Sequence, residues 1–397
     1  MAWVAIAITV WLALLAAILL TWRRPLLALW REPVFTAPIL IVESDDWGAG
    51  PLEQAEALEA ITNCLVRHHD QTGRSPVMTV ALILALPEPG QATRLRQFDE
   101  PEFAPILAAL RAGMEKGVLA PQLHGMTHFW PPALARAAQI QPKVAAWLAA
   151  PDLTENLPSP LQSRWTDASD LPSRPLSTEV IEGAVAEEVA LYVRLLKTGP
   201  EVVVPPTFVW DARVEAAWAA AGVGLVMTPG RRYTGRDGEG RPSGVDRTMR
   251  NGDAAAGGAV YLVRDDYFEP ILGHGSDHAL KSLKSKTELG RPCLLETHRN
   301  NFLVTAGGQP AQSLALLEAM LQKALATYPS LRFCTSAELA RAVRARDATW
   351  VEAGTGRHYA IWLRRAACLP RFGKAARLTG LLSLLRFFAP PGHPLPS

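Results

Sequence analysis

Two adjacent acidic residues, Asp45 and Asp46, end an apolar run that starts at Pro38 (PILIVESDDWG). Glu43 adds a third carboxyl group to the same short stretch. Neighbouring carboxylates repel each other and destabilise a fold unless a positive charge lies beside them. A divalent metal ion is the simplest such charge, so the stretch predicts a metal site at the end of a strand.

Histidines follow two other apolar runs. His124 and His128 are four residues apart in LHGMTHFW, and His298 lies beside Arg299 in LLETHRNNF. Residues four apart share a face if the segment makes a helical turn. One carboxylate and two imidazoles make a three-ligand site for Zn²⁺ or a similar ion, with positions left open for water and a substrate oxygen. The second aspartate is then free to act as a base.

The elements that would position these residues alternate between short apolar runs and amphipathic helical patterns. Such alternation predicts parallel strands covered by helices. Seven or eight repeats, without a glycine-rich dinucleotide loop after the first strand, favour a distorted (β/α) barrel of the α/β class over an open doubly wound sheet. The strands are expected at 38–44, 76–84, 119–124, 201–207, 223–228, 259–264, 292–297 and 331–335. The helices are expected at 53–69, 101–116, 177–198, 211–221, 276–289, 309–327 and 336–345.

Catalytic groups of such a barrel gather at the carboxyl ends of the strands, where both acidic residues and all three histidines are expected. Two stretches read as insertions, 130–176, which is rich in Pro, and 229–258, which is rich in Gly and Arg. Long loops at that end of a barrel usually shape the substrate site.

The quoted motifs resemble those of the NodB-type polysaccharide deacetylase superfamily, whose members are distorted (β/α) barrels. The resemblance covers about residues 38–345. The family's T-F-D-D motif is matched by Glu43-Ser44-Asp45-Asp46, which implies Asp45 as general base and Asp46 as metal ligand. Its H-[ST]-x-x-H motif is matched at His124 and His128, which implies two more ligands. The late L-x-H motif is matched loosely at His298, which implies the catalytic acid, and FCTSAEL (333–339) is similar to the family's last strand and helix.

One family motif is missing from the chain. R-x-P-Y would fall on residues 204–207 (VPPT), which contain neither the arginine that pairs with the base nor the tyrosine. Arg299 is a candidate for the missing cation. The expected substrate-binding residues are Trp47 and Trp130, which follow the two metal motifs, together with Trp210, Asp266 and His274.

The resemblance implies a metal-dependent hydrolase, most simply with Zn²⁺, that removes N- or O-linked acetyl groups from a carbohydrate or glycolipid. Two alternatives stay open. The absent R-x-P-Y motif suits a catalytically inactive barrel that binds glycan or scaffolds a membrane assembly. Nothing in the residues identifies a sugar ring, so a metal-dependent amidase acting on a non-sugar substrate is the other alternative.

The first helix is expected to be a membrane anchor. Residues 2–22 carry no charge and are bracketed by Trp3 and Trp22, and at about 1.5 Å per residue they reach roughly 30 Å, the thickness of a bilayer core. A cleaved signal peptide would instead have a basic start and a small-x-small cleavage site. Arg23, Arg24 and Arg31 follow the helix, which favours the cytoplasmic side for the body of the protein, whereas glycan deacetylases usually act outside.

The net charge and the cysteines limit the classes of partner and of structural cross-link that the chain is expected to have. The formal net charge of +2 argues against a nucleic-acid partner, and the four isolated cysteines give no disulfide or metal framework. From Gly354 to Ser397 there are seven Lys or Arg residues and no acidic residue, with an amphipathic stretch at 374–388. This stretch suits either an anionic leaflet or a helix packed on the domain with a solvated basic edge. The expected organisation is an anchor at 1–24, a linker at 25–37, the barrel at 38–346 and a basic amphipathic tail at 347–397.

Overall fold

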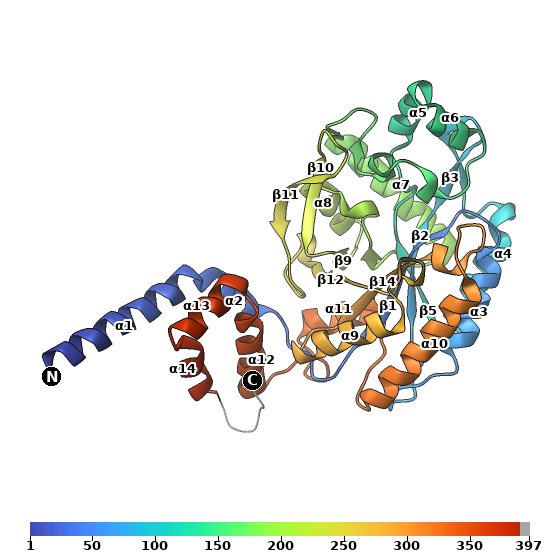
Figure 1. The fold of residues 1–397 in the computed structure, drawn as a ribbon. Coiled ribbons are helices and arrows are strands. Elements are labelled where there is room, and N and C mark those ends of the chain that lie inside the picture. Colours follow the sequence, from blue (N-terminus) through green and yellow to red (C-terminus); the bar gives the residue numbers. More distant parts are fainter. Residues whose placement is uncertain (390–397) are drawn as a thin grey trace.

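A computed structural model of the chain describes residues 1–389. Its centre is a parallel sheet of eight strands in the order β12-β9-β8-β5-β2-β1-β14-β13 (Figure 1). Seven of these strands coincide with predicted apolar runs, whereas β13 was not predicted. The strands are β1 (Leu40–Gly48), β2 (Met78–Ile83), β5 (Leu119–Leu123), β8 (Val202–Val203), β9 (Leu225–Thr228), β12 (Val260–Val263), β13 (Asp266–Tyr267) and β14 (Cys293–His298).

Helices surround this sheet, so the expectation of an α/β fold with barrel-like curvature is confirmed. They are α3 (Gln54–Leu65), α4 (Ala104–Glu115), α7 (Thr178–Leu196), α8 (Ala212–Ala220), α9 (Ser276–Glu288), α10 (Pro310–Thr327) and α11 (Ser336–Ala345). Over residues 1–389 the edge strands β12 and β13 do not pair with each other, so the sheet is a curled half-barrel. The strand expected at 331–335 makes only the bridge between Ile39 and Arg332.

Side chains of β1 alternate between two buried layers. Leu40 and Val42 join the large core beneath the helices, whereas Ile41 joins the core on the opposite face, with residues of β9, β12 and α11. Because successive side chains of a strand point to opposite faces, Glu43 and Asp45 share the face of Ile41. Glu43 and Asp45 therefore lie on the same side of the sheet as this second core.

Both predicted insertions contain structure of their own. Residues 130–176 include α5 (Pro131–Ile140), α6 (Pro142–Ala149), β6 (Thr166–Asp167) and β7 (Arg174–Pro175), and α5 and α6 pack around a small separate core. Residues 229–258 form a hairpin of β10 (Arg231–Arg236) and β11 (Pro242–Thr248). A further hairpin, β3 (Ala85–Glu88) with β4 (Gln91–Gln97), was not predicted because β4 is mostly polar.

Short 3-10 helices join many of these elements, and several lie at the carboxyl ends of the strands. They are η1 (Pro101–Phe103), η2 (Thr154–Asn156), η3 (Ser159–Gln162), η4 (Pro206–Phe208), η5 (Ala256–Gly258), η6 (Pro270–Leu272) and η7 (Arg299–Phe302).

The two ends of the chain meet in one group of helices, which we call the terminal helical unit. It contains α1 (Ala2–Thr21), α2 (Arg23–Arg31), α12 (Thr355–Ala367), α13 (Pro370–Leu378) and α14 (Leu381–Phe387), packed around a common apolar cluster. Figure 1 shows this unit beside the half-barrel, with α1 pointing away from it. The linker expected at 25–37 is thus partly helical, and the expected tail holds three helices; residues 390–397 of that tail lie outside the described residues.

Helix α1 is long and apolar enough to cross a membrane, and most of it is uncovered by the rest of the protein. A signal sequence has the same length and composition.

Candidate metal centre and active site

Asp46, His124 and His128 converge at the carboxyl ends of β1 and β5, as the sequence predicts. Asp46 Oδ1 lies 3.3 Å from His124 Nε2 and 3.4 Å from His128 Nε2, and one ligand atom from each residue lies within 4.8 Å of the others. Ligand atoms held at 2.0–2.2 Å around a tetrahedral ion are about 3.4 Å apart. The three buried residues are therefore spaced as a metal site requires.

The hydrogen bonds around this group also leave room for a cation. The Nδ1–H of His124 donates to the carbonyl oxygen of Val204 at 2.7 Å, which leaves Nε2 as a lone-pair donor facing Asp46. Asp46 Oδ1 is buried without a hydrogen-bond partner within the described chain. Burial of such an atom is costly, so the arrangement fits a positively charged ligand. An aspartate with two imidazoles suits Zn²⁺ among common ions.

The protonation of His128 suits the same role. Burial lowers the pKa of His128 to about 4, so the imidazole is neutral at neutral pH and able to ligate. Burial opposes ionisation of Asp46, but the nearby imidazoles, with His128 foremost, hold its pKa well below the ordinary value. The backbone contributes too, since Asp46 adopts a left-handed φ of 74° that re-aims its side chain at a break in the pairing of β1 with β2.

Asp45 is paired with a cation that the sequence did not identify. Arg264, which directly follows β12, donates two hydrogen bonds to Asp45, Nη1 to Oδ1 at 2.8 Å and Nη2 to Oδ2 at 2.5 Å. Burial would raise the pKa of Asp45, but the guanidinium of Arg264 outweighs it and lowers the pKa. Asp45 is thereby kept ionised, as a general base must be.

Arg264 also joins the edge strand β12 to β14 and β1 across the open side of the sheet. Its fully buried side chain extends from β12 to β14, where Nε lies 3.1 Å from Glu296, and to β1, where Nη1 lies 3.7 Å from Glu43. Burial raises the pKa of Glu43 to about 7, although Arg264 and the hydroxyl of Ser336 act in the opposite direction. A single buried cation thus lies within 3.7 Å of three carboxyl groups.

His298, at the end of β14, is held by a second unforeseen residue. Its Nδ1–H donates to Glu269 Oε1 at 2.5 Å, and Asn301 donates to the other oxygen of the same carboxylate. Burial would lower the pKa of His298, but the Glu269 carboxylate prevails and raises the pKa to about 10. His298 is thus protonated at neutral pH, with Nε2 free of that contact.

The place expected for Arg299 is taken by Arg264. Arg299 is fully buried at the start of η7 and pairs with Glu155 of η2, Nε to Oε1 at 3.1 Å and Nη2 to Oε2 at 3.0 Å. It therefore fastens the 130–176 insertion to the carboxyl end of the sheet instead of contacting Asp45.

Two of the three tryptophans expected to bind substrate are core residues. Trp47 is fully buried, donates to the Ser44 hydroxyl at 2.7 Å and packs against Phe302. Trp210 is fully buried as well. Neither ring offers a face for stacking, because both rings lie in the large core. Trp130 is only partly buried, with Arg164 over its ring, so its role stays a prediction.

Asp266 and His274 lie near the carboxyl end of β14, in the segment that carries Glu269. Asp266 is 3.2 Å from Lys286 Nζ, and His274 stacks on His278 with ring centroids 4.4 Å apart. Neither touches the metal group in the described chain, and a role in substrate binding stays a prediction for both.

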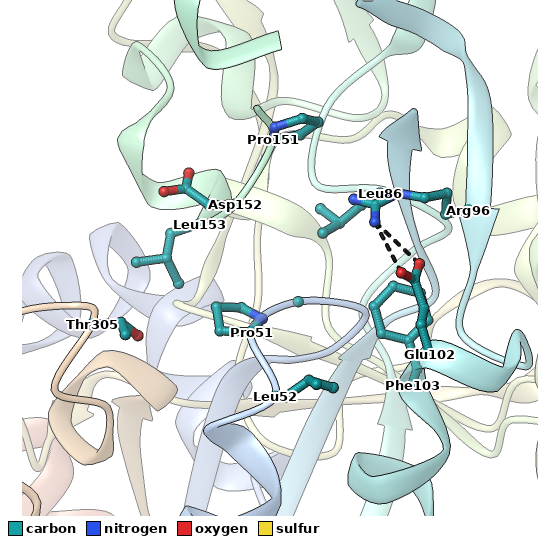
Figure 2. Close-up of a pocket in the computed structure, with 11 residues that line it drawn as sticks. Pro51, Leu52, Leu86, Arg96, Glu102, Phe103, Pro151, Asp152, Leu153 and Thr305 are labelled. Carbon is teal, nitrogen blue, oxygen red and sulfur yellow. Dashed lines mark hydrogen bonds and ion pairs between the residues drawn. The ribbon is translucent and has the colours of Figure 1, made fainter. Parts of the chain in front are cut away.

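A pocket of about 410 Å³ lies next to Arg299, between the loop after β1, the β3–β4 hairpin with η1, and the insertion (Figure 2). Gly50 belongs to its wall, and a Cβ placed there would lie 2.7 Å from Arg299 Nη1. Figure 2 shows Pro51 and Leu52 facing Pro151 and Leu153 across the space, with the Arg96–Glu102 ion pair on the third side. The pocket gives the candidate site a neighbouring cavity with both apolar and charged walls.

Comparisons with known proteins were made for the sequence and for the fold. No protein-family model and no curated protein matches this chain. Among solved structures, a putative polysaccharide deacetylase from Mycobacterium smegmatis is similar at a TM-score of 0.41 and 11% identity, over 78% of this chain and 91% of that one. The peptidoglycan deacetylase PdaC from Bacillus subtilis gives 0.37 and 10%, over 79% and 95%.

A 4-alpha-glucanotransferase from Thermococcus litoralis is also similar, at a TM-score of 0.41 and 12% identity over 90% of this chain. This chain spans about half of that enzyme's length, 49%.

Proposed function

We propose that this protein is a metal-dependent hydrolase that removes N- or O-linked acetyl groups from a carbohydrate. The observation that carries the proposal is the convergence of three parts at one end of the sheet. These are a ligand group, Asp46 with His124 and His128; a charged base, Asp45 on Arg264; and a protonated histidine, His298 on Glu269.

A divalent ion, which we propose is Zn²⁺, would polarise the acetyl carbonyl and make an adjacent water more acidic. In this proposal Asp45 accepts the proton of the attacking water, and the support is that Arg264 keeps it ionised and fixes both of its oxygens. His298 gives a proton to the departing nitrogen or oxygen of the sugar, and the support is its raised pKa. Glu269 fixes the tautomer and the ring orientation of His298 through Nδ1.

The paired base and acid support an enzyme over an inactive barrel. The lack of R-x-P-Y raised the possibility of inactivity, because the base would have no cation. Arg264 supplies a buried, bidentate cation from another strand. A scaffold would have no need to bury a base, an acid and a ligand group together at one strand end.

We further propose that α1 anchors the enzyme in a membrane, with the arginines after it favouring the cytoplasmic face for the half-barrel. The substrate proposed is a carbohydrate or glycolipid. A reporter fused to the carboxyl terminus of the full chain reads the side directly, and a signal only on the outer face would contradict the orientation.

Acetate release by the purified full-length protein tests the activity. The zinc-loaded protein is expected to release acetate from N- or O-acetylated oligosaccharides, with Asp45→Asn and His298→Gln each lowering kcat/KM at least about 100-fold. Asp170→Asn, an exposed carboxylate of the insertion, is the matched control and should change nothing. Faster release from a simple acetyl amide would point to a non-sugar amidase, and no release from any substrate would favour the inactive barrel.

A further inference from the structure

The terminal helical unit has an unusual charge balance. Residues 2–31 contain three arginines, residues 354–389 contain seven Lys or Arg residues, and neither segment contains an acidic residue. The fold brings these two ends of the chain, more than 300 residues apart, into one apolar cluster. Positive charge from both termini is therefore concentrated on one small unit, whereas the rest of the protein carries all of the acidic residues.

The carboxyl-terminal helices pack along the second half of α1. The indole N–H of Trp11 donates to the carbonyl oxygen of Thr379, in the turn between α13 and α14, at 2.9 Å. Trp22 packs against Phe372 of α13, with ring centroids 6.1 Å apart. Leu15 and Ile18 of α1 are buried in the same cluster. The turn at Thr379 is thus fixed near the middle of α1.

This contact constrains how deep the unit lies if α1 spans a bilayer. The 20 residues of α1 are about 30 Å long, which equals the thickness of a bilayer core, so all of α1 is needed to cross it. Trp11 is ten residues from Thr21, or about 15 Å along the helix. A spanning α1 therefore places Thr379 well below the headgroups, together with the ends of the two helices that flank it.

Large apolar side chains are exposed at the turn and at the far end of α14. Leu378 at the end of α13 is 78% exposed, and Phe387 and Phe388 at the end of α14 are 82% and 68% exposed. In water, three such large apolar side chains on one short hairpin would be unfavourable. Lys374 and Arg377 are exposed on α13 as well, and long cationic side chains can extend to the headgroups while their stems stay in apolar surroundings.

We propose that α13 and α14 insert into the same leaflet as α1, and that the exposed cations of the unit bind anionic lipid headgroups there. The occupant of this surface is then an anionic bilayer leaflet, which the absence of acidic residues and the continuity with α1 both favour. This inference is independent of the hydrolase activity.

The unit is fastened to the half-barrel, so insertion fixes the position of the whole protein. Arg365 of α12 is buried and donates to four carbonyl oxygens, those of Glu32, Pro33, Leu289 and Gly290, at 2.8–3.0 Å. It therefore connects α12 to the end of α2 and to the chain just before β14. The inserted hairpin and the enzyme body move together.

Depth measurements on the full-length protein in vesicles test the insertion. With exposed Cys368 replaced by serine, an environment-sensitive fluorophore is attached to Leu378→Cys or Phe387→Cys. Ile140→Cys, a similarly exposed position on α5, is the control. Strong quenching by nitroxides on the acyl chains is expected at the first two positions and none at the third. Equal, weak quenching at all three would overturn the proposal.

Charge reversal tests the headgroup preference with the same probe at Leu378. Insertion is expected to be stronger in vesicles with anionic lipid than in neutral ones, and Arg371→Glu with Lys374→Glu should weaken it about tenfold or more in the anionic vesicles. Arg174→Glu with Arg241→Glu, on the half-barrel, is the matched control and should have no effect.

Insertion independent of anionic lipid would contradict the headgroup assignment. A surface that instead binds a second copy of the chain would show fluorophore self-quenching that grows with the ratio of protein to lipid, and this result would also overturn the proposal.

Discussion

Two buried charged clusters in the half-barrel differ in how their polar atoms are satisfied. Glu215 of α8 accepts from Arg232 at 2.8 Å, from the Tyr261 hydroxyl at 2.6 Å and from the backbone N–H of Ala256 at 3.0 Å. Arg232 also donates twice to Asp246, at 2.9 Å each time. No side-chain oxygen or nitrogen of this pair lacks a partner within the described chain.

The group at the end of β1 is equally buried but incomplete. Asp46 Oδ1 has no donor, although two imidazole nitrogens lie within 3.4 Å of it, and His128 Nδ1 has no partner in the described residues either. Folding alone would select against such atoms, because each costs about 1–3 kcal/mol when left unpaired. The cluster of Glu215 and Arg232, whose charged atoms all have partners, therefore has a structural role. The group around Asp46, whose ligand atoms converge without partners in the described chain, is instead expected to bind a ligand.

The largest effect is expected when a ligand is removed from the incomplete group. Asp46→Asn should abolish stoichiometric metal binding and lower kcat/KM about 1000-fold or more, because the ion supplies several kcal/mol of transition-state stabilisation. Asparagine is chosen since it tolerates the left-handed φ of this position better than alanine. Metal analysis and initial rates check the result, and a variant with full metal content would contradict the assignment.

Removing the cation of the Glu215 cluster should lower stability and leave metal binding unchanged. Arg232→Met leaves Glu215 buried without its cation, and the free energy of unfolding is expected to fall by about 3–5 kcal/mol. Metal content of the folded fraction should not change. Denaturant unfolding measures the free energy, and metal analysis of the same samples measures the metal content. If Arg232→Met lost metal as well as stability, the two clusters would not have separate roles.

Adding zinc to the metal-stripped protein compares the two clusters through the change in Tm that the metal causes. Zinc at 100 times its dissociation constant should stabilise the metal-stripped protein by about 2.7 kcal/mol, since it binds only the folded form. The rise in Tm is expected in the wild type and in Arg232→Met. In Asp46→Asn it should vanish. An equal rise in all three proteins would show that zinc binds elsewhere.

A smaller effect on kcat/KM is expected when Glu269, the partner of His298, is replaced. The Glu269 carboxylate raises the pKa of His298, and His298 must be protonated to act as an acid. Glu269→Gln removes that charge, so the pKa falls and the alkaline limb of the kcat/KM profile should move to lower pH by about one pH unit or more. Glu352→Gln, far from the site, is the control. An unmoved limb would mean that His298 is not the acid.

The sequence revealed those parts of the site that follow strands and lie close together along the chain. Asp45 and Asp46 are adjacent, and His124 and His128 are four residues apart, so their types and spacing were visible without a structure. The alternation of apolar runs and helices likewise predicted most of the sheet, because buried parallel strands leave a strong pattern.

The partners of these residues could not be placed because they depend on how distant strands curl. Arg264 reaches Asp45 across the open side of the sheet, and Glu269 reaches His298 from a short segment with little strand pattern. One signal was available: Arg264 directly follows the buried run AVYLV, at the end of a strand where polar residues were expected to be functional. Burial of Trp47 and Trp210 was not visible from neighbouring motifs either.

The terminal helical unit and the candidate site are attached to opposite ends of the strands. Arg365 contacts Gly290, just before β14, whereas His298 ends that strand beside Asp45 of β1. The strand segment from Leu40 to Asp46 alone separates the two by about 20 Å. A sugar attached directly to a lipid would have to leave the surface to reach the base, so the anchored enzyme would select long glycan chains. Equal rates on a single-sugar glycolipid and a long-chain one in the same vesicle would refute that selectivity.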